Sequence, residues 1–321
     1  MKMKLLAVAL SAIGVAGPAH AGAIAQSELE ISNFRFLNAN GGAVLDASQF
    51  TSLNIVDTTN LNPTFGLNAN PFTQFTLAGV PLPTNVRCAR EVGFSCLGMP
   101  APFTPQLGPA LVTENGALSA SDLNGAPISG LGVAVPVTAR TDAIASRTTT
   151  GAANTTSALS LATSFKFTPL TNLNVIVDFF GLLHLMANAD TLVNAVAGSV
   201  WSINIINHAT GLTVFDWTPD GILNASITGG TEQFDDCDLT RSLTQFGPNA
   251  APAVFDCAAG SRFRATTGLL LAANTYDLSI THQNQANVLV QAVPEPSTLL
   301  LAGFALACLG VGFRRKSESN S

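Results

Sequence analysis

Apolar side chains recur at every second position in much of this chain. In the segment 159–167, Leu, Phe and Thr occupy the odd positions, whereas Ser, Ala and Lys occupy the even ones. Successive side chains of a β-strand point to opposite faces, so this pattern indicates a strand with one face in a core. Further strands are expected at residues 29–37, 50–56, 173–179, 201–205, 212–217, 262–271 and 275–282.

No comparable helical stripe with capping residues occurs in the body of the chain, apart from the ambiguous segment 181–197. Roughly ten strands separated by Gly, Asn and Thr turns indicate an all-β fold. Their uneven spacing favours a β-sandwich or jelly roll over a closed barrel. Eight of the 17 prolines lie between Pro63 and Pro109, and we expect the segment 57–150 to form an irregular insertion rich in Pro and Gly.

The N-terminus has the pattern of a secretory signal peptide. Lys2 and Lys4 precede an apolar run, and Ala19 and Ala21 occupy the small positions of a cleavage site. The sequence therefore predicts a signal helix over residues 1–21 that signal peptidase removes after Ala21.

The C-terminal segment 293–316 combines a proline-flanked acid with an apolar run and a basic cluster. Residues 299–313 are all apolar or Gly, and as a transmembrane helix they would span about 22 Å, which is short for a bilayer core. The basic flank predicts that residues 317–321 form a cytoplasmic tail and that the body lies outside the inner membrane. A permanent single-span anchor is the alternative. The residues concerned are Pro294, Glu295, Pro296, Arg314, Arg315 and Lys316.

This C-terminal arrangement resembles the PEP-CTERM sorting signal. The resemblance covers the segment 293–316 and implies processing by exosortase, a membrane protease-transpeptidase of bacteria with an outer membrane and an exopolysaccharide matrix. It implies export, a transient stay in the inner membrane through the C-terminal helix, and a final place at the cell surface or in the extracellular matrix. It implies nothing about the chemistry of the body, residues 22–292.

Charge excludes one class of partner. Residues 1–21 and 293–321 contain five of the 14 basic residues and two of the 20 acidic ones, so the body carries about nine net negative charges. Binding to nucleic acid requires a cationic surface, and we expect none here.

The cysteines of the body predict disulfides. An exported protein matures in an oxidising compartment, and four cysteines fall into two local pairs, Cys88 with Cys96 and Cys237 with Cys257. A zinc site or free thiols are the alternatives, but no Cys-x-x-Cys spacing supports zinc.

One acidic cluster is the candidate metal site. Asp235, Asp236 and Asp238 surround Cys237, and clustered carboxylates are ligands that Ca²⁺ prefers. The spacing is not that of a known calcium loop, so a solvated acidic turn is the alternative. No other cofactor is expected.

Nothing in the sequence indicates catalysis. His184, His208 and His282 stand apart and no hydrolase motif accompanies them, so we expect a non-enzymatic protein, with a secreted hydrolase as an alternative. Trp201 and Trp217 alternate in phase with apolar neighbours, which indicates a place in the core. Together with Tyr276 they could instead form the stacking platform of a carbohydrate-binding module.

The sequence therefore predicts an exported, exosortase-processed protein. We expect it to have a structural or adhesive role at the cell surface or in the exopolysaccharide matrix. A carbohydrate-binding module and a secreted hydrolase are the alternatives, and extracellular polysaccharide is the expected ligand class.

Overall fold

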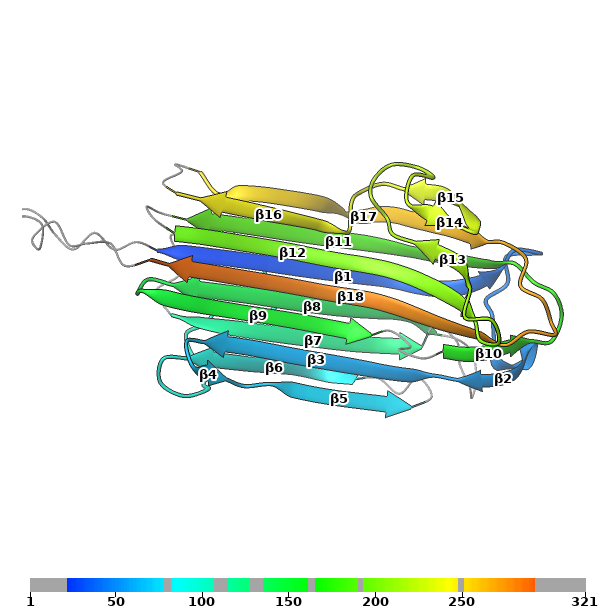
Figure 1. Ribbon diagram of the computed structural model, residues 1–321, viewed down its shortest axis with the longest axis horizontal. Coiled ribbons are helices and arrows are strands. Elements are labelled where there is room, and N and C mark those ends of the chain that lie inside the picture. The colour runs from blue at the N-terminus through cyan, green and yellow to red at the C-terminus, as the bar shows by residue number, and fades with distance from the viewer. Residues whose placement is uncertain are drawn as a thin grey trace, which may run out of the picture.

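The computed structural model describes residues 22–77, 82–106, 115–126, 135–160, 165–189, 193–247 and 251–291 (Figure 1). These residues form antiparallel β-strands and one short 3₁₀ helix, Ala47–Gln49, so the expected all-β class is confirmed. Within these residues no helix has the length and apolar character needed to cross a membrane. The expected signal helix and C-terminal helix lie outside the described residues.

Seven strands form the first sheet, sheet A. Two of its strands, β1 (Ala23–Asn38) and β11 (Val175–Ala189), pair over nearly their whole length in the middle of the sheet. The spatial order is β15 (Gly230–Asp235), β17 (Ala253–Thr267), β11 (Val175–Ala189), β1 (Ala23–Asn38), β8 (Val135–Arg147), β7 (Gly116–Ala126) and β6 (Leu82–Arg90).

Eleven strands form the second sheet, sheet B. Its main path is β14 (Ile227–Thr228), β13 (Thr213–Trp217), β12 (Val193–Asn207), β18 (Tyr276–Val290), β9 (Gly151–Ser160), β3 (Val56–Phe65) and β4 (Asn68–Ala69). Beside this path, β16 (Arg241–Phe246) pairs with β12, β5 (Phe72–Leu77) pairs with β3, and β10 (Phe165–Pro169) pairs with β18 and β2 (Phe50–Asn54).

The two sheets pack face to face and bury one continuous core. Strands β1 and β8 of sheet A lie against β18 and β9 of sheet B. One part of the core is aromatic: the ring of Phe179 stacks on Phe263 at 5.0 Å and lies 4.5 Å from Trp201, all three fully buried. The alternation of apolar and polar residues along the strands therefore has one cause in both sheets, because every second side chain points into the core between them.

Another part of the interior, between β3, β7 and β9, is filled with small hydroxyl residues. Thr59 and Ser121 share a hydrogen bond of 2.5 Å across the sheets, and Ser157 Oγ donates to the carbonyl oxygen of Ala120 at 2.5 Å. Because the buried hydroxyls of Thr59, Ser121 and Ser157 have partners, these three side chains fill the narrow space without leaving a polar group unsatisfied.

The expectation of an irregular insertion over 57–150 is wrong. This segment contributes β3, β5, β6, β7 and β8 to the two sheets. Its strands are rich in Ala, Ser, Thr and Asn, so they present no long apolar run although they bury side chains between the sheets. The ambiguous segment 181–197 belongs to β11 and β12 and not to a helix. Strand β11 is buried on both faces, which removes the two-residue alternation from its sequence.

Irregular backbone in this region is found at residues 91–106, which we call the strap. The strap leaves β6 and crosses the outer face of sheet A, where Met99 packs with Cys88, Leu118 and Ile144 in a second small core. Arg140 lies over the ring of Phe103 at 4.5 Å. The strap therefore covers side chains of sheet A that would otherwise face solvent.

Candidate functional site

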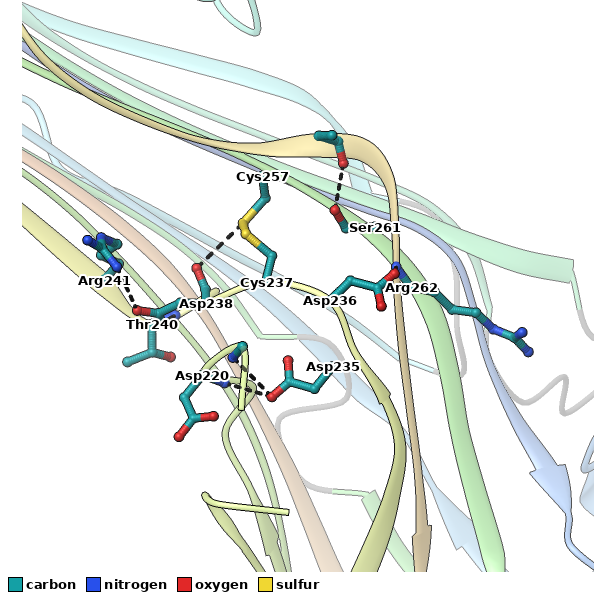
Figure 2. Close-up of a disulfide and its surroundings, with 12 residues drawn as sticks. Asp220, Asp235, Asp236, Cys237, Asp238, Thr240, Arg241, Cys257, Ser261 and Arg262 are labelled. Atoms are coloured by element: carbon teal, nitrogen blue, oxygen red, sulfur yellow. Dashed lines mark hydrogen bonds and ion pairs between the residues drawn. A yellow bond between two sulfur atoms is a disulfide. The ribbon is translucent and has the colours of Figure 1, made fainter. Parts of the chain in front are cut away.

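The three aspartates of the candidate metal site lie around the Cys237–Cys257 disulfide and serve three different segments (Figure 2). Asp235 Oδ2 accepts hydrogen bonds from the N–H groups of Asp220 and Gly221, both at 3.1 Å. Asp236 Oδ2 accepts from Arg262 N–H at 2.7 Å. Asp238 Oδ1 accepts from Thr240 N–H at 2.9 Å.

These bonds give each carboxylate a local structural role. Within the described residues no group of three His, Cys, Asp or Glu side chains is arranged to hold a metal ion. Burial raises the pKa of Asp235 to about 6, although two backbone donors favour its charged form. The geometry therefore gives the calcium hypothesis no support in this part of the chain.

Both expected disulfides are present. Cys88 pairs with Cys96 across a Cα–Cα distance of 5.4 Å, and Cys237 pairs with Cys257 across 5.9 Å. These bonds rule out zinc ligation and free thiols at the four positions. The first disulfide fixes the start of the strap to β6, and the second ties the segment after β15 to β17.

The three histidines of the body do not converge. His184 faces the outer side of sheet A, where its Nδ1 lies 2.6 Å from Asp256. His208 follows β12 in an exposed turn, 2.7 Å from Asp277. His282 lies between the sheets, and burial lowers its pKa to about 3. The three histidines therefore do not form one site.

The aromatic residues of the possible sugar platform are internal. Trp201 and Trp217 are fully buried with their rings 5.6 Å apart, and Tyr276 is 2 % exposed. The indole N–H of Trp217 donates to Glu232, a buried carboxylate. The interpretation of both tryptophans as core residues is confirmed, and the three side chains cannot stack on an external sugar.

A row of titratable side chains that sequence reasoning missed lies on the outer face of sheet A. Asp256, His184, Glu28 and Asp142 are neighbours across β17, β11, β1 and β8, because the register pairs each with the next. The last three are almost completely buried. We call these four residues the titratable row.

The strap closes this row by hydrogen bonds. Phe103 N–H donates to Asp142 Oδ2 at 2.8 Å, and Gln106 N–H donates to the side-chain oxygen of Gln26 at 2.7 Å. Gln26 Nε2 donates to Thr104 O at 3.1 Å, and His184 Nε2 lies 3.2 Å from Gln106 O. The polar side chains of sheet A therefore provide hydrogen-bond partners for backbone N–H and C=O groups of the strap.

Burial dominates the electrostatics of the row. It raises the pKa of Asp142 to about 8, with the neighbouring Glu28 carboxylate as the second cause. Burial also raises the pKa of Glu28, against the opposing effect of His184. Glu28 Oε2 is buried without a hydrogen-bond partner. Glu28 and Asp142 are therefore two adjacent acids that are costly to ionise, and both are buried beneath the strap.

A different surface is open to solvent, the outer face of sheet B. It carries neutral hydrogen-bonding side chains on β3, β9, β18, β12 and β16, all exposed or half-buried: Thr58, Asn60, Asn62, Thr64, Asn154, Thr156, Thr281, Gln283, Gln285, Asn287, Ser202, Asn204, Ser242 and Thr244. Within the described residues, Asp277 is the one charged residue at an outward position of these five strands. We call this surface the neutral face.

Comparison with known proteins identifies one segment of the chain. Residues 292–316 match the PEP-CTERM protein-sorting motif, which confirms the resemblance drawn from the sequence. No curated protein and no solved structure matches the chain. The motif marks an exported protein that exosortase sorts and that has a cell-surface or extracellular destination. The matched segment, with Pro294, Glu295, Pro296 and the basic flank, lies outside the described residues, as do Ala19 and Ala21.

Proposed function

We propose that this chain is a non-enzymatic protein of the cell surface or exopolysaccharide matrix. In our proposal its body binds polysaccharide after exosortase has removed the C-terminal segment. The observation that carries the proposal is the sorting motif at residues 292–316, because it gives the chain its destination. The body supports a structural role: the structure is an extended two-layer sandwich with two disulfides.

The neutral face supports polysaccharide as the ligand class. Its amides and hydroxyls offer both donors and acceptors, which match the hydroxyl groups of a sugar chain. At its centre, Gln285 lies next to Gly198 across the β12–β18 pair. A Cβ at Gly198 would stand 2.9 Å from Gln285 Nε2, so glycine allows the amide to lie flat on the sheet. A flat array of this kind suits an extended polymer better than a small ligand.

The processing of the chain is the first prediction. We expect protein recovered from the cell surface and matrix of the native host to begin at Gly22 and end near Pro294. Intact-mass and terminal-peptide mass spectrometry would measure both ends. Intact chains through Ser321, found only in inner membranes, would show a permanent anchor and contradict processing by exosortase.

The neutral face gives the second prediction. The double variant Gln285→Glu/Asn287→Asp keeps the shape of two central side chains but replaces their amide donors with carboxylates. We expect its apparent Kd for host polysaccharide in a co-sedimentation assay to rise about tenfold, which corresponds to about 1.4 kcal/mol. The control is Gln233→Glu, which adds a carboxylate on the exposed edge strand β15. Equal binding by both variants and the parent would contradict the assignment of the neutral face.

A further inference from the structure

One end of the sandwich displays large apolar side chains to solvent. Leu67, Val92 and Leu97 are 105 %, 89 % and 84 % exposed, and Phe94 is 52 % exposed. Leu67 lies in the turn between β3 and β4, and the other three lie in the first part of the strap. Transfer of such exposed apolar side chains from water to an apolar environment is favourable in free energy.

Hydrogen bonds and a disulfide join the two loops into one surface. Asn68 Nδ2 donates to the carbonyl oxygens of Arg90 and Glu91, at 2.8 and 3.2 Å. Arg90 lies inside the loop that the Cys88–Cys96 disulfide closes, and its side chain donates to the carbonyl oxygen of Leu97, just after that loop, at 2.6 Å. The four apolar side chains are therefore held in place before any partner arrives. We call them the apolar tip.

The chain leaves the body at the same end. Val290, the last residue of β18, pairs with Gly151, and the next residues of β9 bring Gly66 into contact, since Gly66 N–H donates to Ala152 O at 3.0 Å. In Figure 1 the end of β18 and the β3–β4 turn both lie at the left of the molecule. The apolar tip and the exit of the chain thus share one end of the sandwich.

Chain length keeps this end near any membrane that holds the C-terminal segment. Seven residues, 292–298, separate Gln291 from the apolar run 299–313. Even fully extended, they reach about 25 Å. Strand β18 has 15 residues, so the opposite end of the sandwich lies about 50 Å away. The connection is thus about half as long as the body. A body that contacts the membrane through the tip therefore holds the exposed apolar residues of the opposite end, such as Leu212, away from the bilayer.

We propose that the apolar tip inserts into the lipid surface of the inner membrane while the C-terminal segment is still attached. This proposal rests on the proposed sorting of the chain at that membrane. The segment alone would attach the body to the membrane at one point. Contact through the tip adds a second attachment point beside the exit of the chain, and two weak attachments together hold a protein on a bilayer more firmly than one. The proline-flanked motif would then be presented at a fixed height above the bilayer.

Tryptophan reporters test the contact directly. The two native tryptophans are fully buried and give a constant background, so the additional emission of a new tryptophan at Leu67 or Phe94 reports on the tip. The full-length chain, purified from the membranes of an exporting host, is reconstituted into phosphatidylcholine vesicles that contain brominated lipid. We expect the emission contributed by the new tryptophan in Leu67→Trp or Phe94→Trp, obtained by subtracting the emission of the parent chain, to fall about twofold relative to vesicles without bromine. The matched control is Leu212→Trp at the far end, which should not change.

The outcomes separate the two proposals. Flotation of the vesicles first shows whether the chain is anchored by its C-terminal segment. A chain that floats while both tip reporters remain as unquenched as Leu212→Trp overturns the tip contact and leaves the sorting proposal intact. A chain that does not float overturns membrane attachment and the tip contact together. Quenching at the tip but not at residue 212 supports the proposal.

Discussion

Phe179→Ala is expected to lower the free energy of unfolding by about 3–5 kcal/mol, the usual cost of removing a buried aromatic ring. Phe179 is 1 % exposed and lies on β11 in the middle of sheet A. Its ring stacks on Phe263 at 5.0 Å and contacts Trp201 at 4.5 Å and Trp217 at 5.9 Å. These partners come from both sheets, so the ring joins the two layers, and its loss leaves a cavity that neither layer can close alone.

Equilibrium unfolding in guanidinium chloride, followed by the fluorescence of the two buried tryptophans, would measure this loss. Phe246→Ala is the matched control, because Phe246 is 65 % exposed at the end of β16 and its loss should cost less than about 0.5 kcal/mol. An effect of Phe179→Ala below about 1 kcal/mol would mean that the aromatic cluster does not hold the sheets together.

The sequence predicted strands best where large apolar residues alternate with polar ones. Residues 201–205 and 275–282 have this pattern, and they belong to β12 and β18, which pair along their full length. The two disulfides could also be predicted, because short separations leave few geometric alternatives to local pairing. In both cases the information is local in the chain.

Other features depend on contacts that are distant in sequence. The strands within 57–150 bury Ala, Ser and Thr, whose cross-sheet hydrogen bonds, such as that between Thr59 and Ser121, replace large apolar side chains. Glu28 and Asp142 are single acids in separate strands, 114 positions apart in the printed sequence. Their adjacency follows from the pairing of β1 with β8, and their burial follows from the strap. Neither the pairing of β1 with β8 nor the burial by the strap produces a local pattern in the sequence.

The predictions of functional sites show the same contrast between local patterns and contacts that are distant in sequence. The acidic cluster at 235–238 was conspicuous in the sequence, yet each carboxylate is directed to a different backbone segment. The titratable row had no sequence signal as a group, although His184 could be noted singly. A charged residue at an outward position of a strand normally indicates solvent, and only the strap over sheet A reverses that inference.

Asp142→Asn is expected to stabilise the protein more and more as the pH rises. The pKa of Asp142 is about 8 in the folded state, against 3.8 for the free side chain, mainly because of burial and then because of Glu28. Between these two values the folded state keeps a proton that the unfolded state has lost. The contribution of Asp142 to stability is therefore greatest below pH 4 and is lost as the pH rises towards 8.

The groups around Asp142 act in both directions, and burial outweighs the rest. Glu28 on β1 also has a raised pKa from burial, and Glu30 raises it further, whereas His184 on β11 and Arg140 on β8 oppose this effect. The strap contributes the Phe103 N–H, which favours the charged form of Asp142. His282 has the opposite dependence: its pKa is lowered from 6.5 to about 3, so stability is lost as the pH falls through that interval. Comparing a variant with its parent at each pH cancels the contribution of His282.

The measurement is the free energy of unfolding of both proteins between pH 5 and pH 9. About three pH units lie between pH 5 and the pKa of Asp142, and each is worth about 1.4 kcal/mol, so the advantage of Asp142→Asn should grow by something on the order of 4 kcal/mol. Asp122→Asn is the control, since Asp122 is a carboxylate on the neighbouring strand β7 that pairs with Arg140. A constant difference between Asp142→Asn and the parent across this range would show that Asp142 ionises freely in the folded protein. Amide hydrogen exchange at residues 99–106 adds a local readout, because an ionised Asp142 beside Glu28 should open the strap before the two sheets separate.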